Sequence, residues 1–217
     1  NDYFRTLRTF HALPLVSADG LEIDLHRFML EENCYAGADD RLTGRLREAE
    51  VDGLRVTTLS PEDQVINACV HGVRWDPVPP LRWVLDAVMA VRSAGGEMDW
   101  RYLEGESAER GVSLAMAAAL NFARQYEPSI PEATISALAD ASHGRLERWD
   151  FRFQQGGYSA PVQVGRYATR YLRLSSRRSP YRRAREFPTY LAAMWELENA
   201  RRVPVEGVKR VWKAVRK

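Results

Sequence analysis

The sequence predicts an α+β fold in which short antiparallel strands at the N-terminus are followed by a mostly helical bundle. Residues 21–28 alternate between apolar and polar side chains, which is typical of a strand. A strong helix start follows at residue 60, and from there the apolar residues recur at helical spacing. Strands followed by a run of helices indicate an α+β protein rather than a doubly wound sheet.

The first segment is expected to form a β-hairpin. Residues 10–16 form a short run rich in apolar side chains, and Ser17 to Gly20 have turn chemistry. In the next strand Leu21, Ile23 and Leu25 point to one face, while Glu22, Asp24 and His26 point to the other. Residues 31–47 are irregular and predict a loop or a short helix, and residues 51–59 predict a second short hairpin or strand pair.

Helices are expected from residue 60 onward. Ser60 is a good N-cap, Pro61 suits the first helical position, and Asp63 stands where a capping box has its acid. This helix should end near residue 72. Further helices are predicted over residues 81–93, 99–110, 113–126, 131–142 and near 190–201, with a last amphipathic helix from residue 205.

Charge is distributed unevenly along the 217 residues. From Ala160 to the end there are 15 Lys/Arg and 4 Asp/Glu, a net of +11; the totals of 31 and 29 leave 16 and 25 for the rest, a net of −9. The overall balance of +2 says little about partners. An acidic body therefore carries a basic C-terminal segment.

Other features of composition narrow the class of protein. Cys34 and Cys69 are far apart and fit neither a disulfide framework nor a clustered metal site, so a cytoplasmic protein with two buried thiols is expected. The sequence contains no apolar run near 18 residues and no signal peptide, so no membrane span is expected. Because the chain opens on Asn1 rather than Met, we expect a trimmed or longer natural protein.

Three stretches together resemble a known family. They are GLEIDLH at residues 20–26, LSPED at 59–63 leading to CVHG at 69–72, and LRWVLD at 81–86 followed by DW at 99–100. Their order and spacing resemble the uncharacterised nucleotidyltransferase family of the DNA polymerase β-like superfamily, over about residues 10–125. The resemblance implies a small mixed sheet with helices, and three carboxylates that hold two Mg²⁺ ions for phosphoryl transfer.

Within this resemblance Asp24 matches the third carboxylate and is expected to be a catalytic metal ligand. Glu22 and His26 share its face and are expected as supporting side chains; three ligands at alternate positions span about 13 Å, too far for a single ion. The alternative is an ordinary strand that exposes its polar face to solvent. The family's paired aspartates normally precede the hairpin, and no Asp-x-Asp stretch does so here. The adjacent pair Asp39 and Asp40 would not share a strand face. We therefore expect a form that is truncated and inactive by itself.

Four residues are candidates for nucleotide binding. The family implies that His71 and Arg74 lie near the triphosphate and that Asp86 orients Arg82 or His71. From spacing alone, His71 suits the C-terminal end of a helix, where its charge complements the dipole. Arg82 and Asp86 at i, i+4 suit an ion pair within one helix.

The basic segment is the second candidate region. Arginines interleaved with tyrosines suit phosphate or nucleic-acid contacts, although such a stripe also suits a solvated face. The arginines singled out are Arg177, Arg178, Arg182 and Arg183.

The sequence thus predicts transfer of a nucleotidyl group from an NTP to an unknown acceptor with Mg²⁺. The alternative is a non-catalytic module that binds nucleic acid or protein through the basic segment. Three parts are expected: residues 1–60 as the C-terminal part of a nucleotidyltransferase-like sheet, 61–150 as a helical domain, and 151–217 as a basic, helical segment.

Overall fold

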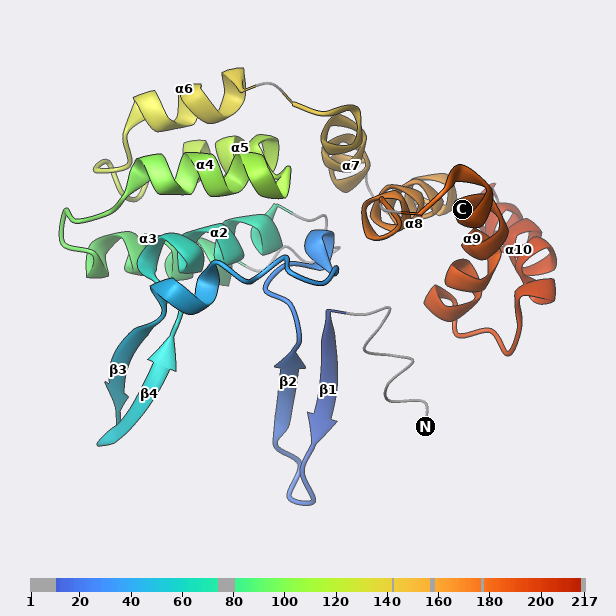
Figure 1. Cartoon of the computed structure of the whole chain (residues 1–217), viewed down its shortest axis with the longest axis horizontal. Helices are drawn as coiled ribbons and strands as arrows, with labels where there is room; N and C mark the ends of the chain where they lie inside the picture. Colours follow the sequence, from blue (N-terminus) through green and yellow to red (C-terminus); the bar gives the residue numbers. More distant parts are fainter. Residues whose placement is uncertain (1–10, 74–80, 142, 157–158, 177, 216–217) are drawn as a thin grey trace. The chain divides into compact units, whose positions relative to one another are not determined.

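A computed structural model of the chain describes residues 11–73, 81–141, 143–156, 159–176 and 178–215. Among them are nine α-helices and two short antiparallel sheets of two strands, so the predicted α+β class is confirmed (Figure 1). The chain divides into two compact units. We call Gly37–Gln155 the central unit, and Asn1–Ala36 together with Gly156–Lys217 the terminal unit. The predicted division at residues 60 and 150 stays a prediction.

The first sheet, in the terminal unit, is the predicted hairpin. Strand β1 (Ala12–Val16) pairs with β2 (Glu22–His26), and the turn between them has Gly20 at φ +86°. The register puts Leu13 opposite Leu25 and Leu15 opposite Ile23, so one face is apolar. Ile23 and Leu25 are each 53% exposed, which shows that this hairpin does not pack its apolar face into a core.

The second sheet, in the central unit, is also a hairpin. Strand β3 (Arg47–Val51) pairs with β4 (Leu54–Thr58) through Asp52 and Gly53, which have φ of +50° and +77°. Asp-Gly accepts positive φ at both central positions of a tight turn, so this dipeptide sets the register. The prediction over residues 51–59 is therefore confirmed as a hairpin, but the sheet begins four residues earlier.

Helices α2 (Pro61–Gly72), α3 (Arg82–Ser93), α4 (Trp100–Arg110) and α5 (Ser113–Ala123) form the body of the central unit. Helix α2 packs on the other three, and its Val65, Ile66 and Cys69 are fully buried. Leu103 and Met116 complete this core, and burying such side chains stabilises a protein by roughly 1.5–3 kcal/mol each. Helices α6 (Glu132–Asp140) and α7 (Arg145–Gln155) contact α5. Two 3₁₀ turns, Glu31–Asn33 and Leu42–Arg45, precede these helices.

The terminal unit is built on helices α8 (Ala160–Leu174), α9 (Pro180–Met194) and α10 (Val203–Val215), with a 3₁₀ turn at Ala200–Arg202. The helix predicted near residues 190–201 is wrong in its bounds. Ser179 caps α9 by accepting from the Arg182 amide, and Pro180 occupies its first position. The helix ends before Glu196, whose φ of +56° is incompatible with a continuing helix.

Aromatic side chains form the centre of the terminal unit. Tyr171 of α8 lies 5.2 Å from the ring of Phe187 and 5.0 Å from that of Tyr190, both on α9. Leu30 is fully buried, and α8 contacts the 3₁₀ turn that follows it. Within the residues described, no helix combines the length and apolar character needed to cross a membrane.

Candidate functional site

Strand β2 brings Glu22, Asp24 and His26 onto one face of the first hairpin, as predicted. Asp24 lies opposite Pro14, and all five residues of β2 are exposed. Glu22 and Asp24 are two positions apart, so their Cα atoms are separated by about 7 Å along the strand. This face therefore presents two carboxylates to solvent within reach of a common ligand.

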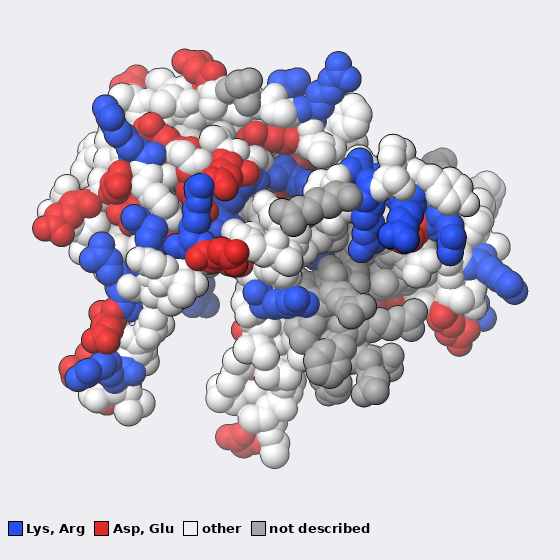
Figure 2. Space-filling model, viewed as in Figure 1, with Lys and Arg blue, Asp and Glu red and all other residues white. Residues whose placement is uncertain are grey.

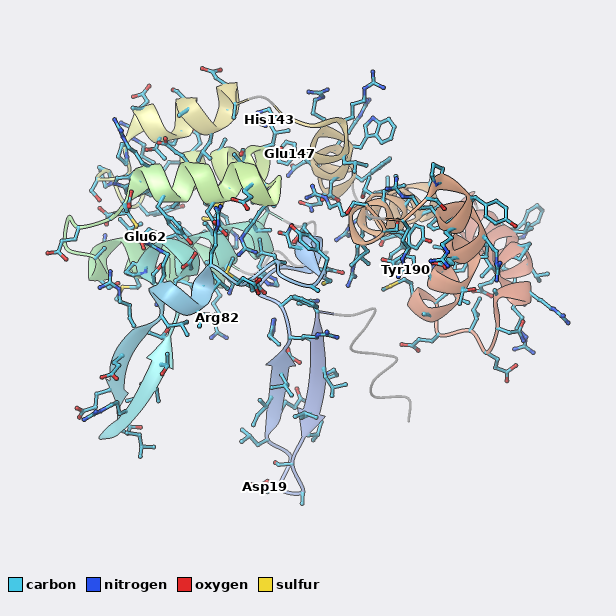
Figure 3. The ribbon with its side chains drawn as sticks, viewed as in Figure 1. Asp19, Glu62, Arg82, His143, Glu147 and Tyr190 are labelled. Carbon is cyan, nitrogen blue, oxygen red and sulfur yellow. The ribbon has the colours of Figure 1, made fainter. Side chains whose placement is uncertain are left out.

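The turn before β2 fixes the position of this face. The Ser17 hydroxyl accepts from the Leu21 amide at 2.9 Å and donates to the Asp19 carboxylate. That hydrogen bond favours the ionised form and holds the pKa of Asp19 below its ordinary value. Figure 3 shows Asp19 at the tip of the hairpin. The turn thus sets which side chains of β2 share the face of Asp24.

The donors on this face suit a hard cation. Carboxylate oxygens are the protein ligands that Mg²⁺ prefers, and the ion requires six oxygens in octahedral geometry. His26 lies against His11, with ring centroids 5.1 Å apart. Among the described residues there is no group of three or more His, Cys, Asp or Glu that could hold a metal ion. Asp24 and Glu22 therefore have the type of donor atom that such an ion prefers, and they would supply only some of its six ligands.

The residues predicted to bind nucleotide belong to the central unit, whereas Asp24 belongs to the terminal unit. His71 lies in the last turn of α2 and is partly exposed. Arg82 and Asp86 of α3 form the predicted i, i+4 ion pair, with Nε and Oδ2 3.6 Å apart. Their side chains are 86% and 53% exposed, so the pair contributes little to stability and stays accessible. Arg74 lies outside the described residues.

Helices α2 and α3 meet closely beside these residues. A Cβ atom added to Gly72 would lie 2.1 Å from the ring of Trp83, which is closer than any real contact. The Trp83 ring is in turn 5.9 Å from that of Phe122 on α5. A glycine is thus required next to His71, because only a hydrogen lets the indole pack at this point.

A polar cluster, which we call the α2 cluster, lies at the start of α2 and consists of Ser60, Glu62, Asp63, Arg45 and Tyr102. Arg45 donates to Glu62 at 2.7 Å, and its guanidinium lies over the Tyr102 ring at 3.6 Å. Asp63 accepts from the Tyr102 hydroxyl at 2.9 Å and from Ser60 at 2.8 Å. The predicted capping residues therefore also join α2 to α4 and to the 3₁₀ turn that contains Arg45.

Burial affects the two acids of this cluster differently. Desolvation raises the pKa of Asp63, and the hydrogen bonds from Ser60 and Tyr102 only partly oppose it. Burial also acts to raise the pKa of Glu62, but the Asp99 amide and Arg45 bind its charged form and hold the pKa below its ordinary value. Both carboxylates are engaged within the fold, which indicates a structural role for LSPED.

A second buried network fixes the end of α4. Arg110, 3% exposed, donates to Glu106 at 2.7 Å and to Asp39 at 2.9 Å. Arg41 lies 3.6 Å from Glu106 and also pairs with Glu109. Asp39 thus holds an arginine through its carboxylate. The sequence did not reveal these partners, because 71 residues separate Asp39 from Arg110.

A buried acid also supports α5. The Leu114 amide, in the first turn of α5, donates to Glu147 of α7 at 3.0 Å. His143 lies 3.5 Å from the same carboxylate, and both side chains are labelled in Figure 3. A carboxylate at this position complements the positive end of the α5 dipole. The hydrogen bond from Leu114 to Glu147 joins α5 to α7, and the Glu147 side chain is shielded from solvent.

Some arginines of the basic segment form ion pairs or hydrogen bonds within the fold. Arg178 pairs with Glu186, and Arg183 donates to the carbonyls of Ser175 and Ser176 beyond the end of α8. Arg182 is exposed. Arg177 lies outside the described residues. Nucleic-acid binding by these arginines stays a prediction.

Arg170 has a different role from the other arginines of the segment. It is 6% exposed, pairs with Glu31 and lies 3.9 Å from the Cys34 sulfur. Burial raises the pKa of Cys34 to about 11 and that of Cys69 to about 12. Both cysteines are free and buried, as the sequence predicted.

A model for the uncharacterised nucleotidyltransferase family matches residues 1–127. No curated protein and no solved structure matches the chain significantly. The matched region contains the first hairpin with Asp24 and the helices with His71, Arg82 and Asp86.

Proposed function

Because the chain belongs to the uncharacterised nucleotidyltransferase family, we propose that it takes part in the Mg²⁺-dependent transfer of a nucleotidyl group from an NTP to a hydroxyl or phosphate acceptor. The observation that carries this proposal is the accessible carboxylate face of β2 within the matched region. Asp24 and Glu22 there are both exposed and share one face of a short strand.

In this proposal Asp24 is a metal ligand. Bound Mg²⁺ would stabilise charge on the triphosphate and orient the attacking oxygen. The Asp24 carboxylate would hold the ion on the open side of the hairpin, and Glu22 and His26 would support it through hydrogen bonds to water or to phosphate oxygens. The remaining oxygen ligands would come from outside β2.

Within the central unit, the candidates for nucleotide contacts are those that the family implies. Arg82 keeps most of its guanidinium exposed while it pairs with Asp86. It could therefore exchange a weak ion pair for a phosphate group, which it can bind through two parallel hydrogen bonds. His71 and Arg74 would add hydrogen-bond donors at the triphosphate.

The experiment measures transfer of label from an α-³²P NTP mixture to cellular extract or to the protein itself. It uses the natural protein that contains these residues. Asp24→Asn is expected to lower transfer by roughly 100-fold or more, because it removes a charged ligand from the metal. The matched control is Glu50→Gln on β3, also an exposed strand carboxylate, which should retain activity. Unchanged transfer by Asp24→Asn would remove this residue from the mechanism.

We further propose that the 217 residues by themselves do not catalyse transfer, because the family's pair of aspartates has no counterpart before β2. Pyrophosphate release from ATP is the measurement. Mg²⁺-dependent release by the 217-residue protein, lost in Asp24→Asn, would contradict the proposed inactivity while supporting the role of Asp24.

A further inference from the structure

Helix α10 has an apolar stripe that faces solvent. Val205, Val208 and Trp212 recur at i, i+3 and i+7, so they share one side of the helix. They are 59%, 70% and 60% exposed. A helix that docked through this side within the terminal unit would bury these residues, so packing among the described residues of that unit does not explain the stripe.

The opposite side of α10 makes the contacts that hold it. The guanidinium carbon of Arg210 lies 5.0 Å from the centre of the Trp195 ring. Gly207 is close to the same ring, because a Cβ atom added to it would lie 3.8 Å from the nearest ring atom of Trp195. Trp195 is itself only 8% exposed. Helix α10 thus contacts Trp195 through Gly207 and Arg210, and the apolar stripe lies on the opposite, exposed side of the helix.

The sequence that contains the stripe is rich in positive charge. Residues 200–217 contain seven Lys/Arg and one acid, Glu206, a net of +6. Arg202 pairs with Glu198 and Arg210 with Glu206, whereas Arg201 and Lys209 are exposed and form no ion pair with any residue that the structure describes. Figure 2 shows further Lys and Arg of the terminal unit gathered over α8 and α9.

We propose that α10 is a peripheral docking helix for an anionic phospholipid surface. Apolar side chains with a tryptophan would enter the headgroup boundary, and the neighbouring cations would contact lipid phosphates. Nucleic acid would satisfy the cations alone and leave the valines in water. A lipid interface satisfies both, since it offers negative charge and an apolar layer a few ångströms apart.

The test is sedimentation of the 217-residue protein with vesicles of phosphatidylcholine, alone or mixed with phosphatidylglycerol at about 7:3. The protein is expected to bind the mixed vesicles roughly tenfold or more tightly than the neutral ones, and binding should weaken with salt. The triple variant Val205→Ser, Val208→Ser, Trp212→Ser should lower the affinity by roughly tenfold or more, because the apolar contribution is lost.

A matched control removes exposed apolar area elsewhere. Leu85 and Met89 of α3 are 61% and 53% exposed, and Leu85→Ser with Met89→Ser should bind mixed vesicles like the unchanged protein. Circular dichroism should show equal helix content in all variants.

Three outcomes would overturn the proposal. The first is no sedimentation with mixed vesicles, and the second is equal binding by the triple variant. The third is self-association that the triple variant loses, without vesicle binding, which would assign the stripe to a second copy of the chain. Oligonucleotide binding without vesicle binding falls under the first outcome and would assign the cations to nucleic acid.

Discussion

Glu62 and Asp63 are neighbours in the first turn of α2, yet the fold shifts their pKa values in opposite directions. Asp63 is fully buried, and desolvation dominates its pKa. Glu62 is 2% exposed, but an arginine and a backbone amide bind its charged form. At the residue scale, the partners of a buried carboxylate therefore matter as much as its burial.

The lowered pKa of Glu62 implies that the contribution of this side chain to stability depends on pH. A carboxylate whose pKa is lower in the folded state stabilises the protein above its unfolded pKa, near 4.5, and that contribution is lost as the pH falls through the folded value. Glu62→Gln should therefore lower the free energy of unfolding by about 1–3 kcal/mol at pH 7 and by clearly less at pH 4. Urea denaturation at both pH values is the measurement. A difference of equal size at both would contradict this account, and Glu48→Gln on β3 should have no effect at either.

Arg45 should be the most sensitive side chain of the α2 cluster. Arg45→Met keeps much of the packing on Tyr102 but leaves Glu62 without its ion pair. We expect a loss of about 2–3 kcal/mol, less than for a fully buried pair because the Arg45 side chain is 28% exposed. Arg47→Met, an exposed change on β3, should cost less than about 0.5 kcal/mol. Equal effects of the two changes in urea denaturation would refute the role assigned to Arg45.

At the scale of elements, the close packing of α3 on α2 requires glycine at residue 72, because its side chain is only a hydrogen atom. The Trp83 ring occupies the space where a side chain would begin. Helix α4 contains Gly105, around which a Cβ would meet nothing within 4 Å. Gly72 is the last residue of α2 and Gly105 lies in the middle of α4, and the space available to a side chain differs sharply between them.

Alanine should have opposite effects at these two positions. Gly72→Ala is expected to destabilise the protein by about 2–4 kcal/mol, because the indole must move from its packed position. Gly105→Ala should stabilise it by roughly 0.5–1 kcal/mol through helix propensity. Thermal denaturation monitored by circular dichroism compares them. A stabilising Gly72→Ala would mean that Trp83 does not pack there.

The elements with local signals were predictable from the sequence. Ser60 with Pro61 marked the start of α2, Asp99 caps α4, and the bounds of α3 agree within one residue. Helix α7 was missed although Leu146, Trp149 and Phe153 recur at helical spacing, and its buried residues are instead the polar Glu147, Asp150 and Gln154. The start of α9 was also missed, although Ser179 and Pro180 provide the same signal as at α2.

The candidate site was predictable only in part. Alternation along β2 correctly placed Glu22, Asp24 and His26 on one face, and spacing correctly paired Arg82 with Asp86. The α2 cluster could not be predicted, because it joins Arg45 and Tyr102 to α2 across 17 and 39 residues. Contacts of that length depend on how the helices pack, and local spacing carries no information about packing.

For the whole molecule, the family match and the basic segment belong to different parts of the chain. The match covers residues 1–127, while the net charge of +11 lies beyond residue 159. The proposed transfer chemistry would therefore depend on the matched region, and the proposed lipid contact on α10. Because different side chains carry the two activities, changes in α10 should leave metal binding at β2 intact.

The most direct test of the account is to locate a bound metal ion on the 217-residue protein. Mn²⁺ can replace Mg²⁺ at carboxylate sites, and it broadens the NMR signals of nearby amides even when it binds weakly. In the presence of a non-hydrolysable ATP analogue, we predict selective broadening at residues 22–26 and at their partners 12–16, and none of this in Asp24→Asn. Broadening at Glu48 and Glu50 as strong as at Asp24, or a pattern unchanged by Asp24→Asn, would contradict the assignment of β2 as the metal-binding strand.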